Sequence, residues 1–284
     1  MHLIDGIVGG TVIVVTNDQA TKAARFRELH HGPSPLLLPN PWDAGTARLL
    51  AAMGFDALAT TSLGVANKVG RTGATQQEIL DNCREIDEAT PLPVNADLEN
   101  GFADDPAEAA KAIELAARAG VVGASIEDHT GRPDAPIYDF ELAVDRVRAA
   151  VETAHALPVP VLLTARAENL LHGVNDLDDT IRRLQAFEEA GADVLYAPGL
   201  RTLAEMRTVV DSVGKPVNVV MGFADPAITV EQLAEIGVRR VSIGAALSRI
   251  ALKSFMAAAQ QMRAGRFGFV ADLPPIADLH QHFI

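Results

Sequence analysis

The chain has 284 residues, of which 48% are hydrophobic, and it carries a formal net charge of −13. A chain of this length and apolar content can bury a large core, and a single α/β barrel of about 250 residues would account for nearly all of it. The acidic balance argues against a nucleic-acid partner, because such proteins carry a basic patch or stripe.

The amino terminus and the cysteine content give no sign of a disulfide or a membrane anchor. Cys83 is the single cysteine, which excludes an internal disulfide and suits a reducing compartment, so we expect a cytoplasmic protein. Residues 6–15 are apolar, but no Lys or Arg precedes them and they are too few to span a bilayer as a helix. We expect residues 1–20 to form a poorly ordered extension, or alternatively an added strand or plug, and residues 21–284 to form one domain.

A unit consisting of an Ala-rich amphipathic helix, a glycine and a short apolar strand recurs along the chain. Its predicted helices span residues 46–53, 106–119, 180–190 and 230–236, and they are followed by Gly54, Gly120, Gly191 and Gly237. Glycine just past a helix adopts the left-handed cap conformation at little cost, so each glycine is predicted to end its helix. Asp43 is predicted to be the N-cap of the first of these helices.

The full pattern predicts eight strands, at residues 36–39, 57–61, 94–97, 122–126, 159–164, 194–196, 216–220 and 241–243. Strands that alternate with helices indicate a parallel sheet, and eight of them in about 210 residues favour a closed TIM-type (α/β)₈ barrel. Catalytic groups of such barrels lie at the carboxyl ends of the strands. Residues 245–264 then form a long apolar helix, which is expected to contact a partner subunit or to cover the barrel bottom.

Polar side chains end two neighbouring strands at the predicted catalytic face. Asn95, Asp97 and Glu99 share one face of their strand, because side chains alternate with a period of two, and Glu127 ends the next strand. Such oxygen-only groups favour Mg²⁺ or Mn²⁺ over zinc. The alternative for Glu99 and Asp128 is that they cap helices or pair with a nearby arginine.

Other polar groups at the same predicted rim could bind an anion. Arg166 ends an apolar strand and could clamp a carboxylate through two parallel hydrogen bonds, or form a buried ion pair with Glu168 or Glu127. Hydroxyl or backbone N–H groups of the turn after the second strand could hold an anionic oxygen. Asn218, an amide in an apolar strand, could contact a ligand or bond within the barrel.

Two histidines, a tyrosine and the single cysteine are further reactive side chains of the chain. His129 and His172 follow the fourth and fifth strands and could shuttle protons, although a lone loop histidine is more often solvated. Tyr138 is a loop candidate without specific support. Cys83 lies in a predicted helix at residues 76–88, so we place it on the outer ring and do not propose it as a nucleophile.

The combination Asn-Ala-Asp-x-Glu-x-Gly, Ile-Glu-Asp and Thr-Ala-Arg resembles the isocitrate lyase and phosphoenolpyruvate mutase superfamily, from about residue 26 to about residue 264. The resemblance implies an (α/β)₈ barrel that binds Mg²⁺ and forms or breaks a C–C or P–C bond next to a 2-oxo acid through an enolate-like intermediate. It also implies a homo-oligomer, a dimer or a tetramer, in which the last helix is exchanged between subunits.

The resemblance assigns roles to particular residues. Asp97 matches the central metal-site aspartate, Glu127 a metal-site glutamate that often acts through water, and Arg166 the arginine that binds the substrate carboxylate. The turn that holds the 2-oxo acid in the superfamily matches Thr61-Ser62-Leu63-Gly64. An amide that contacts the substrate matches Asn218.

The chain departs from the superfamily pattern at three places. Asn95 replaces the first aspartate of the usual Asp-x-Asp pair and is retained as a metal-site candidate, and Thr72 stands where many members carry an acidic residue. A subgroup of the superfamily shares this asparagine and also has the glutamate found here at position 99. Glu99 could therefore restore the negative charge that is lost at Asn95. The loop at residues 128–136 lacks the Lys-(Lys/Arg)-Cys-Gly-His motif of the true lyases and the lysine- and asparagine-bearing loop of the phosphonopyruvate enzymes.

These features favour a Mg²⁺-dependent carbon–carbon lyase for small anionic 2-oxo or 2-hydroxy di- or tricarboxylic acids. Decarboxylation of an oxaloacetate-type acid is the simplest version, because loss of CO₂ requires no general base. Retro-aldol cleavage also requires an acid and a base, and the candidates for catalysis are Arg166, Glu99 and His129. The alternatives are a phosphonopyruvate-type hydrolase or mutase, and a non-catalytic 2-oxo-acid-binding protein.

Overall fold

The computed structural model describes residues 4–8, 11–15 and 17–283, and within them eight parallel strands form one sheet in the order β3-β10-β9-β8-β7-β6-β5-β4. Their bounds are β3 (Leu36–Leu38), β4 (Leu58–Ala59), β5 (Val94–Asp97), β6 (Gly123–Glu127), β7 (Leu162–Arg166), β8 (Val194–Tyr196), β9 (Val217–Val220) and β10 (Arg240–Ser242). The two ends of the order meet where the Ala59 amide donates to the Pro39 carbonyl at 3.0 Å. The predicted (α/β)₈ barrel is therefore confirmed.

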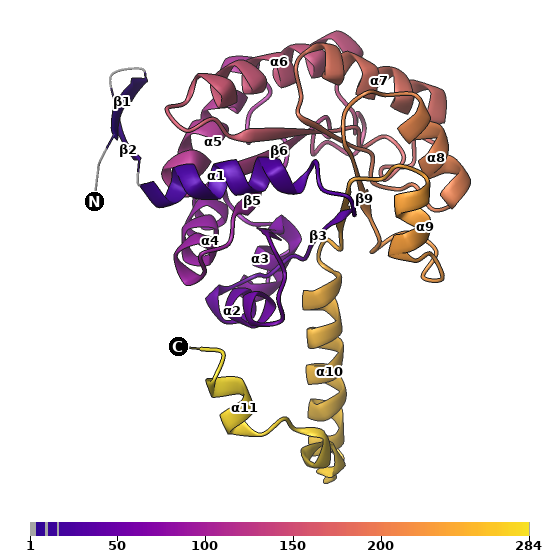
Figure 1. Ribbon diagram of the computed structural model, residues 1–284. Coiled ribbons are helices and arrows are strands. Elements are labelled where there is room, and N and C mark those ends of the chain that lie inside the picture. Colours follow the sequence, from indigo (N-terminus) through magenta and orange to yellow (C-terminus); the bar gives the residue numbers. More distant parts are fainter. Residues whose placement is uncertain (1–3, 9–10, 16, 284) are drawn as a thin grey trace.

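Helices surround this barrel, as Figure 1 shows. They are α1 (Asn17–Leu29), α2 (Ala44–Ala52), α3 (Ser62–Val69), α4 (Gln76–Ala89), α5 (Pro106–Arg118), α6 (Phe140–Ala156), α7 (Leu177–Glu189), α8 (Leu203–Asp211) and α9 (Val230–Glu235). The four predicted stop glycines all adopt positive φ, between 85° and 102°. Asp43 caps α2 with a full capping box, in which its carboxylate accepts from the Thr46 amide.

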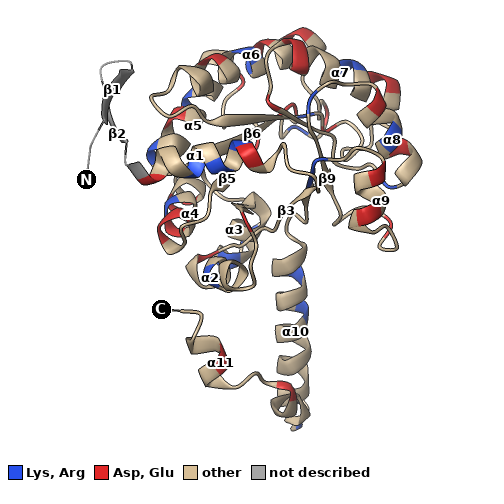
Figure 2. Ribbon diagram, in the orientation of Figure 1, with Lys and Arg blue, Asp and Glu red and all other residues tan. Residues whose placement is uncertain are grey.

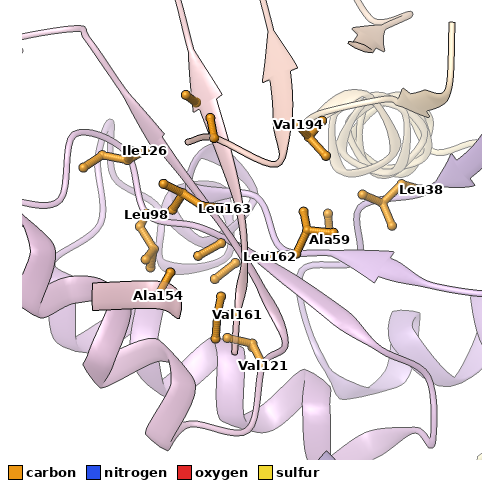
Figure 3. Close-up of a cluster of buried hydrophobic side chains, with 14 of the residues drawn as sticks. Leu38, Ala59, Leu98, Val121, Ile126, Ala154, Val161, Leu162, Leu163 and Val194 are labelled. Carbon is orange, nitrogen blue, oxygen red and sulfur yellow. The ribbon is translucent and has the colours of Figure 1, made fainter. Parts of the chain in front are cut away.

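The core follows from the alternation of side chains along the strands. Leu98, Ile126 and Leu163, which are almost completely buried, come from neighbouring segments and gather between the sheet and its helices (Figure 3). The residues that alternate with them, among them Ser125 and Arg166, line a cavity inside the barrel. Alternation on buried strands thus places the polar side chains on the barrel axis.

Helix α1 packs against the end of the barrel where the strands begin. Phe26 is fully buried, and a Cβ atom on Gly123, the first residue of β6, would lie 2.5 Å from the Phe26 ring. One turn later, His30 stacks edge-on against Phe26 with 4.7 Å between ring centroids. The Nδ1 atom of His30 lies 2.8 Å from the Phe26 carbonyl, and its Nε2 atom lies 3.4 Å from Nη1 of Arg240 at the start of β10.

Stability should fall in mildly acidic solution because of His30. Burial, followed by the Arg240 charge, lowers the pKa of His30 from 6.5 to about 3. Below pH 6.5 the unfolded chain binds a proton that the folded chain does not, so stability present above this pH is lost as the pH falls. We expect the His30 contribution to the free energy of unfolding to decrease by about 1.2 kcal/mol between pH 6 and pH 5.

Urea unfolding at several pH values tests this expectation. His30→Gln should remove this part of the slope, whereas His31→Gln, a change at the exposed neighbouring residue, should keep it. Parallel curves for the wild type and His30→Gln would contradict it.

Helix α10 (Ala246–Arg263) projects away from the barrel, and η1 (Gly268–Asp272) and α11 (Ile276–His280) follow it (Figure 1). Its apolar residues are exposed, with Phe255 at 70% and Met256 at 58%, and most of the helix is neutral in Figure 2. It therefore does not cover the barrel bottom, where α1 lies. Exchange of this helix with a partner subunit stays a prediction.

The segment before α1 contains a separate hairpin. Strands β1 (Ile4–Val8) and β2 (Thr11–Val15) pair with each other in antiparallel fashion and form their own two-stranded sheet. The predicted extension, residues 1–20, includes positions outside the described residues, so its order and the domain boundary remain predictions. None of the helices in the described part of the chain is both long and apolar enough to cross a membrane.

Candidate active site

A cavity of about 260 Å³ opens at the carboxyl ends of the strands. Residues from most of the strands and from the turns that follow them line it, among them Thr61, Ser62, Asn95, Asp97, Ser125, Arg166, Tyr196, Asn218, Arg240 and Ser242. The structure thus brings the polar strand ends singled out in the sequence to one place.

Arg166, the last residue of β7, is the centre of an ion-pair cluster at this cavity. Its guanidinium lies 2.9 Å from Asp97, 3.0 Å from Glu127 and 2.8 Å from Glu168. Burial alone would lower the pKa of Arg166, but the charges of these carboxylates raise it well above its usual value. The ion-pair alternative for Arg166 is therefore realised in this structure, with Asp97 as an additional partner, while its role as a substrate clamp remains a prediction.

The cluster carries more negative than positive charge. Burial raises the pKa of Glu99, and the negative charges of nearby Asp97 and Glu127 raise it further, to about 7. A divalent cation would offset this excess, and carboxylate oxygens are the ligands that Mg²⁺ prefers. Within the described residues no three His, Cys, Asp or Glu side chains converge closely enough to hold a metal directly. A cation at this cluster would therefore have to bind largely through its water ligands.

The backbone at the end of β5 determines where Asp97, Asn95 and Glu99 lie. The Ser62 amide donates to Asp97 Oδ2 at 2.9 Å, so the start of α3 orients this carboxylate. Asn95 sits one layer deeper, and its Oδ1 atom is buried without a hydrogen-bond partner among the described residues. β5 ends at Asp97, so simple alternation does not place Glu99, which adopts a φ of 49° in the turn that follows.

His129 and His172 lie together beside the cluster. Their rings stack with 3.6 Å between centroids and 7° between planes. His129 Nδ1 lies 3.7 Å from Glu127, and His172 Nε2 lies 3.6 Å from Glu168. The bond to Glu127 raises the pKa of His129, against the effect of burial. Two loops that are separate in the sequence thus place both imidazoles next to the carboxylates that bind Arg166.

The hydroxyl-rich turn after β4 leads directly into α3. Thr61 is the N-cap, and its Oγ1 atom accepts from the Gly64 amide at 3.3 Å. A Cβ atom on Gly64 would lie 2.5 Å from the Thr61 side chain, so glycine is required there for packing. Thr61 and Ser62 line the cavity, and their predicted contact with a ligand remains a prediction.

Asn218 bonds within the barrel and also lines the cavity. Its Oδ1 atom accepts from Arg240 Nε at 2.8 Å, and its Nδ2 atom donates to Ser242 Oγ at 3.0 Å. Two further cavity residues, Arg240 and Tyr196, were not predicted from the sequence. The Tyr196 ring lies 5.0 Å from the Arg166 guanidinium. The signal for Arg240 is its alternation with Ser242 on one strand, which predicts a shared inward face.

Three other candidates have structural partners. Asp128 pairs with Arg183 at 3.1 Å and its other oxygen accepts from the Glu168 amide at 2.7 Å, so the pairing alternative is confirmed for Asp128. Tyr138 is buried and donates to Asp104 at 2.5 Å. Burial raises the pKa of Cys83 to about 12, as suits a structural thiol.

A family model described as phosphoenolpyruvate phosphomutase matches residues 26–263. The chain belongs to this family. The 2-methylisocitrate lyase of Escherichia coli (strain K12) is 32% identical over 222 residues, which cover 73% of this chain and 73% of that protein. The oxaloacetate decarboxylase of Pseudomonas entomophila (strain L48) is 28% identical over 239 residues, which cover 81% of this chain and 80% of that protein.

A solved structure from Burkholderia cenocepacia J2315 superposes with a TM-score of 0.92 at 52% identity, covering 94% of this chain and 97% of that one. The matched family is named for a mutase, and the two relatives are a lyase and a decarboxylase. The chain is therefore an enzyme of the lyase and mutase type. The superfamily resemblance and its span are thereby confirmed.

Proposed function

We propose that the protein is a Mg²⁺-dependent carbon–carbon lyase that acts on small 2-oxo or 2-hydroxy di- or tricarboxylic acids. Decarboxylation of an oxaloacetate-type acid is its simplest reaction. The observation that carries this proposal is the convergence of Asp97, Glu127 and Glu168 on Arg166 at a small cavity. The relatives named 2-methylisocitrate lyase and oxaloacetate decarboxylase support the choice of substrate class.

Asp97 and Glu127 would hold the cation, in part through water, because both carboxylates also bind Arg166. When bound, the cation supplies positive charge that stabilises the negative charge developing on the carboxylate and keto oxygens of the substrate. Asn95, two positions before Asp97 on β5, lines the same cavity and would add its Oδ1 atom, unpaired among the described residues, to the oxygen ligands of the cation or of its water.

Arg166 would bind a substrate carboxylate through two parallel N–H bonds after giving up one of its present partners. Thr61 and Ser62 line the mouth and would orient the acid with their hydroxyl groups. Glu99, with a pKa of about 7, exists in both protonation states at neutral pH. It can therefore take up or return a proton at its carboxylate, as retro-aldol cleavage requires. His129, which pairs with Glu127, is the second candidate for this proton transfer.

An NMR screen tests the proposed function. The protein is incubated with phosphonopyruvate and with a panel of 2-oxo and 2-hydroxy mono-, di- and tricarboxylic acids, with Mg²⁺ in one arm and EDTA in the other. We expect loss of one or more di- or tricarboxylic acids, with appearance of a product shortened at a carbon–carbon bond, in the Mg²⁺ arm alone. Release of phosphate from phosphonopyruvate, or consumption that is equal in both arms, would contradict the proposal.

A further inference from the structure

Arg240 is a second guanidinium that lines the cavity, below Arg166. It begins β10, is only 2% exposed, and donates from Nε to Asn218 at 2.8 Å and from Nη2 to Thr164 at 3.0 Å. Its Nη1 atom lies 3.4 Å from His30 Nε2. These partners hold the guanidinium in a fixed orientation within the barrel.

All three partners of Arg240 are neutral. His30 Nδ1 donates to the Phe26 carbonyl at 2.8 Å, and its Nε2 atom, 3.4 Å from Arg240 Nη1, accepts from that group with its lone pair, so the ring is neutral. The pKa of His30, lowered to about 3 by burial and then by Arg240, keeps the ring uncharged at neutral pH. The charge of Arg240 is thus held in place without being neutralised.

Arg166 and Arg240 differ sharply in their counter-ions. Arg166 has three carboxylates around it, whereas no carboxylate of the described chain forms an ion pair with Arg240, whose pKa burial lowers to about 9. A buried charge without a partner is costly. Of the five N–H groups of an arginine, two remain after the bonds to Asn218, Thr164 and His30 are counted. An anion in the cavity would complete this set.

The Arg240 guanidinium is anchored one step deeper in the barrel than Arg166, through Thr164 on β7. Thr164, which binds Arg240, and Arg166 lie two positions apart on the same face of β7, roughly 6.6 Å along the strand. The Ser242 hydroxyl accepts from Asn218 at 3.0 Å and can donate its own proton into the cavity beside Arg240. The cavity therefore offers positive charge at its floor and an ion cluster at its mouth.

We propose that Arg240, with the Ser242 hydroxyl, forms an anion subsite that binds the distal carboxylate of the substrate, so that the enzyme selects diacids over monoacids of equal length. Asn218 and Thr164 are positioning residues of this subsite, because they act on the ligand through Arg240. The inference rests on the proposed function in one respect, namely that the other end of the acid binds at the mouth near Asp97 and Arg166.

Calorimetric titration with malate and 2-hydroxybutyrate tests the subsite, because these acids differ only in a terminal carboxylate or methyl group. In the presence of Mg²⁺, the wild type should bind malate at least about tenfold more tightly. Arg240→Gln should weaken malate binding about 10- to 100-fold, the effect of a lost charged hydrogen bond, and 2-hydroxybutyrate binding less than about threefold. The matched control is Arg239→Gln, at an exposed neighbouring residue, which should change neither affinity.

Three results would overturn the subsite: equal affinity of the wild type for both acids, no malate binding by the wild type at millimolar concentration, or an equal loss for both acids in Arg240→Gln. If Arg240→Gln does not fold, Arg240→Lys replaces it, because lysine retains the charge and should retain a reduced preference for malate. The comparison of malate with 2-hydroxybutyrate on the wild type requires no variant. Malate binding that depends on Arg240 without turnover of any acid would remove the lyase function alone. Turnover of diacids that is insensitive to Arg240→Gln would remove the subsite alone.

Discussion

Asp97→Asn is expected to reduce Mg²⁺-dependent turnover about 100- to 1000-fold while the protein stays folded, the loss typical of one electrostatic group at a reacting centre. Asp97 contacts Arg166 with one oxygen and the Ser62 amide with the other. Asparagine has nearly the same shape and keeps an oxygen for one of these bonds, but it lacks the charge that would hold the cation. The measurement is the rate of consumption of the acid identified by NMR, as a function of Mg²⁺ concentration.

The control for this prediction is Asp134→Asn, which removes one negative charge from an exposed loop position. It should leave both the rate and the Mg²⁺ dependence unchanged. Thermal unfolding of the two variants separates loss of chemistry from loss of fold. An Asp97→Asn enzyme that keeps its Mg²⁺ dependence and its rate within about threefold, much less than the effect of a single lost electrostatic group, would refute the assigned metal site.

Arg166→Met should abolish turnover and also destabilise the protein by about 3–5 kcal/mol, the usual cost of removing one partner of a buried ion pair. The reason is that the substitution leaves three carboxylates, those of Asp97, Glu127 and Glu168, without the guanidinium that pairs with all of them. The Glu168 side chain is only 1% exposed, so water cannot replace this partner. Urea unfolding measures the loss. Added Mg²⁺ should stabilise this variant more than the wild type, since it meets a larger excess of negative charge.

Arg182→Met provides the comparison, because Arg182 is an exposed residue whose ion pair with Asp179 lies on the outer surface. Exposed pairs contribute about 0–1 kcal/mol, so its stability should change little. Equal stability of Arg166→Met and the wild type would show that the three carboxylates are not ionised together, and the charge argument for a divalent cation would fail.

Much of the fold could be predicted from local patterns in the sequence. The four glycines after helices mark real ends because each adopts positive φ, which depends on local backbone sterics. The bounds of β5 and β8 match the predicted strands at residues 94–97 and 194–196. Strand alternation also sufficed to bring Asp97 and Arg166 to a common cavity, because parallel strands in a barrel share one carboxyl face.

The remaining features depend on contacts between distant segments. The three-way pairing of Arg166 joins β5, β6 and the loop after β7, and a single-strand pattern gives no information on which partner is within reach. Arg240 follows Arg239, so this pair looks like a charged loop before the predicted strand at residues 241–243. Its inward position is fixed by the register of β10 with β9, where Arg240 lies opposite Asn218. Likewise, residues 60–61 are predicted to end the strand at residues 57–61, although β4 ends at Ala59 and Thr61 caps α3.

The central claim, that Asp97, Glu127 and Arg166 surround a site for a divalent cation and a small acid, is tested most directly by a crystal soaked with Mn²⁺ and malate. Anomalous scattering at the manganese edge locates the metal independently of any assumed ligand. The account predicts one strong peak at the cavity mouth, bound to Asp97 or Glu127 directly or through one water, with malate between it and Arg240. A strong peak elsewhere, or none at saturating Mn²⁺, would contradict it.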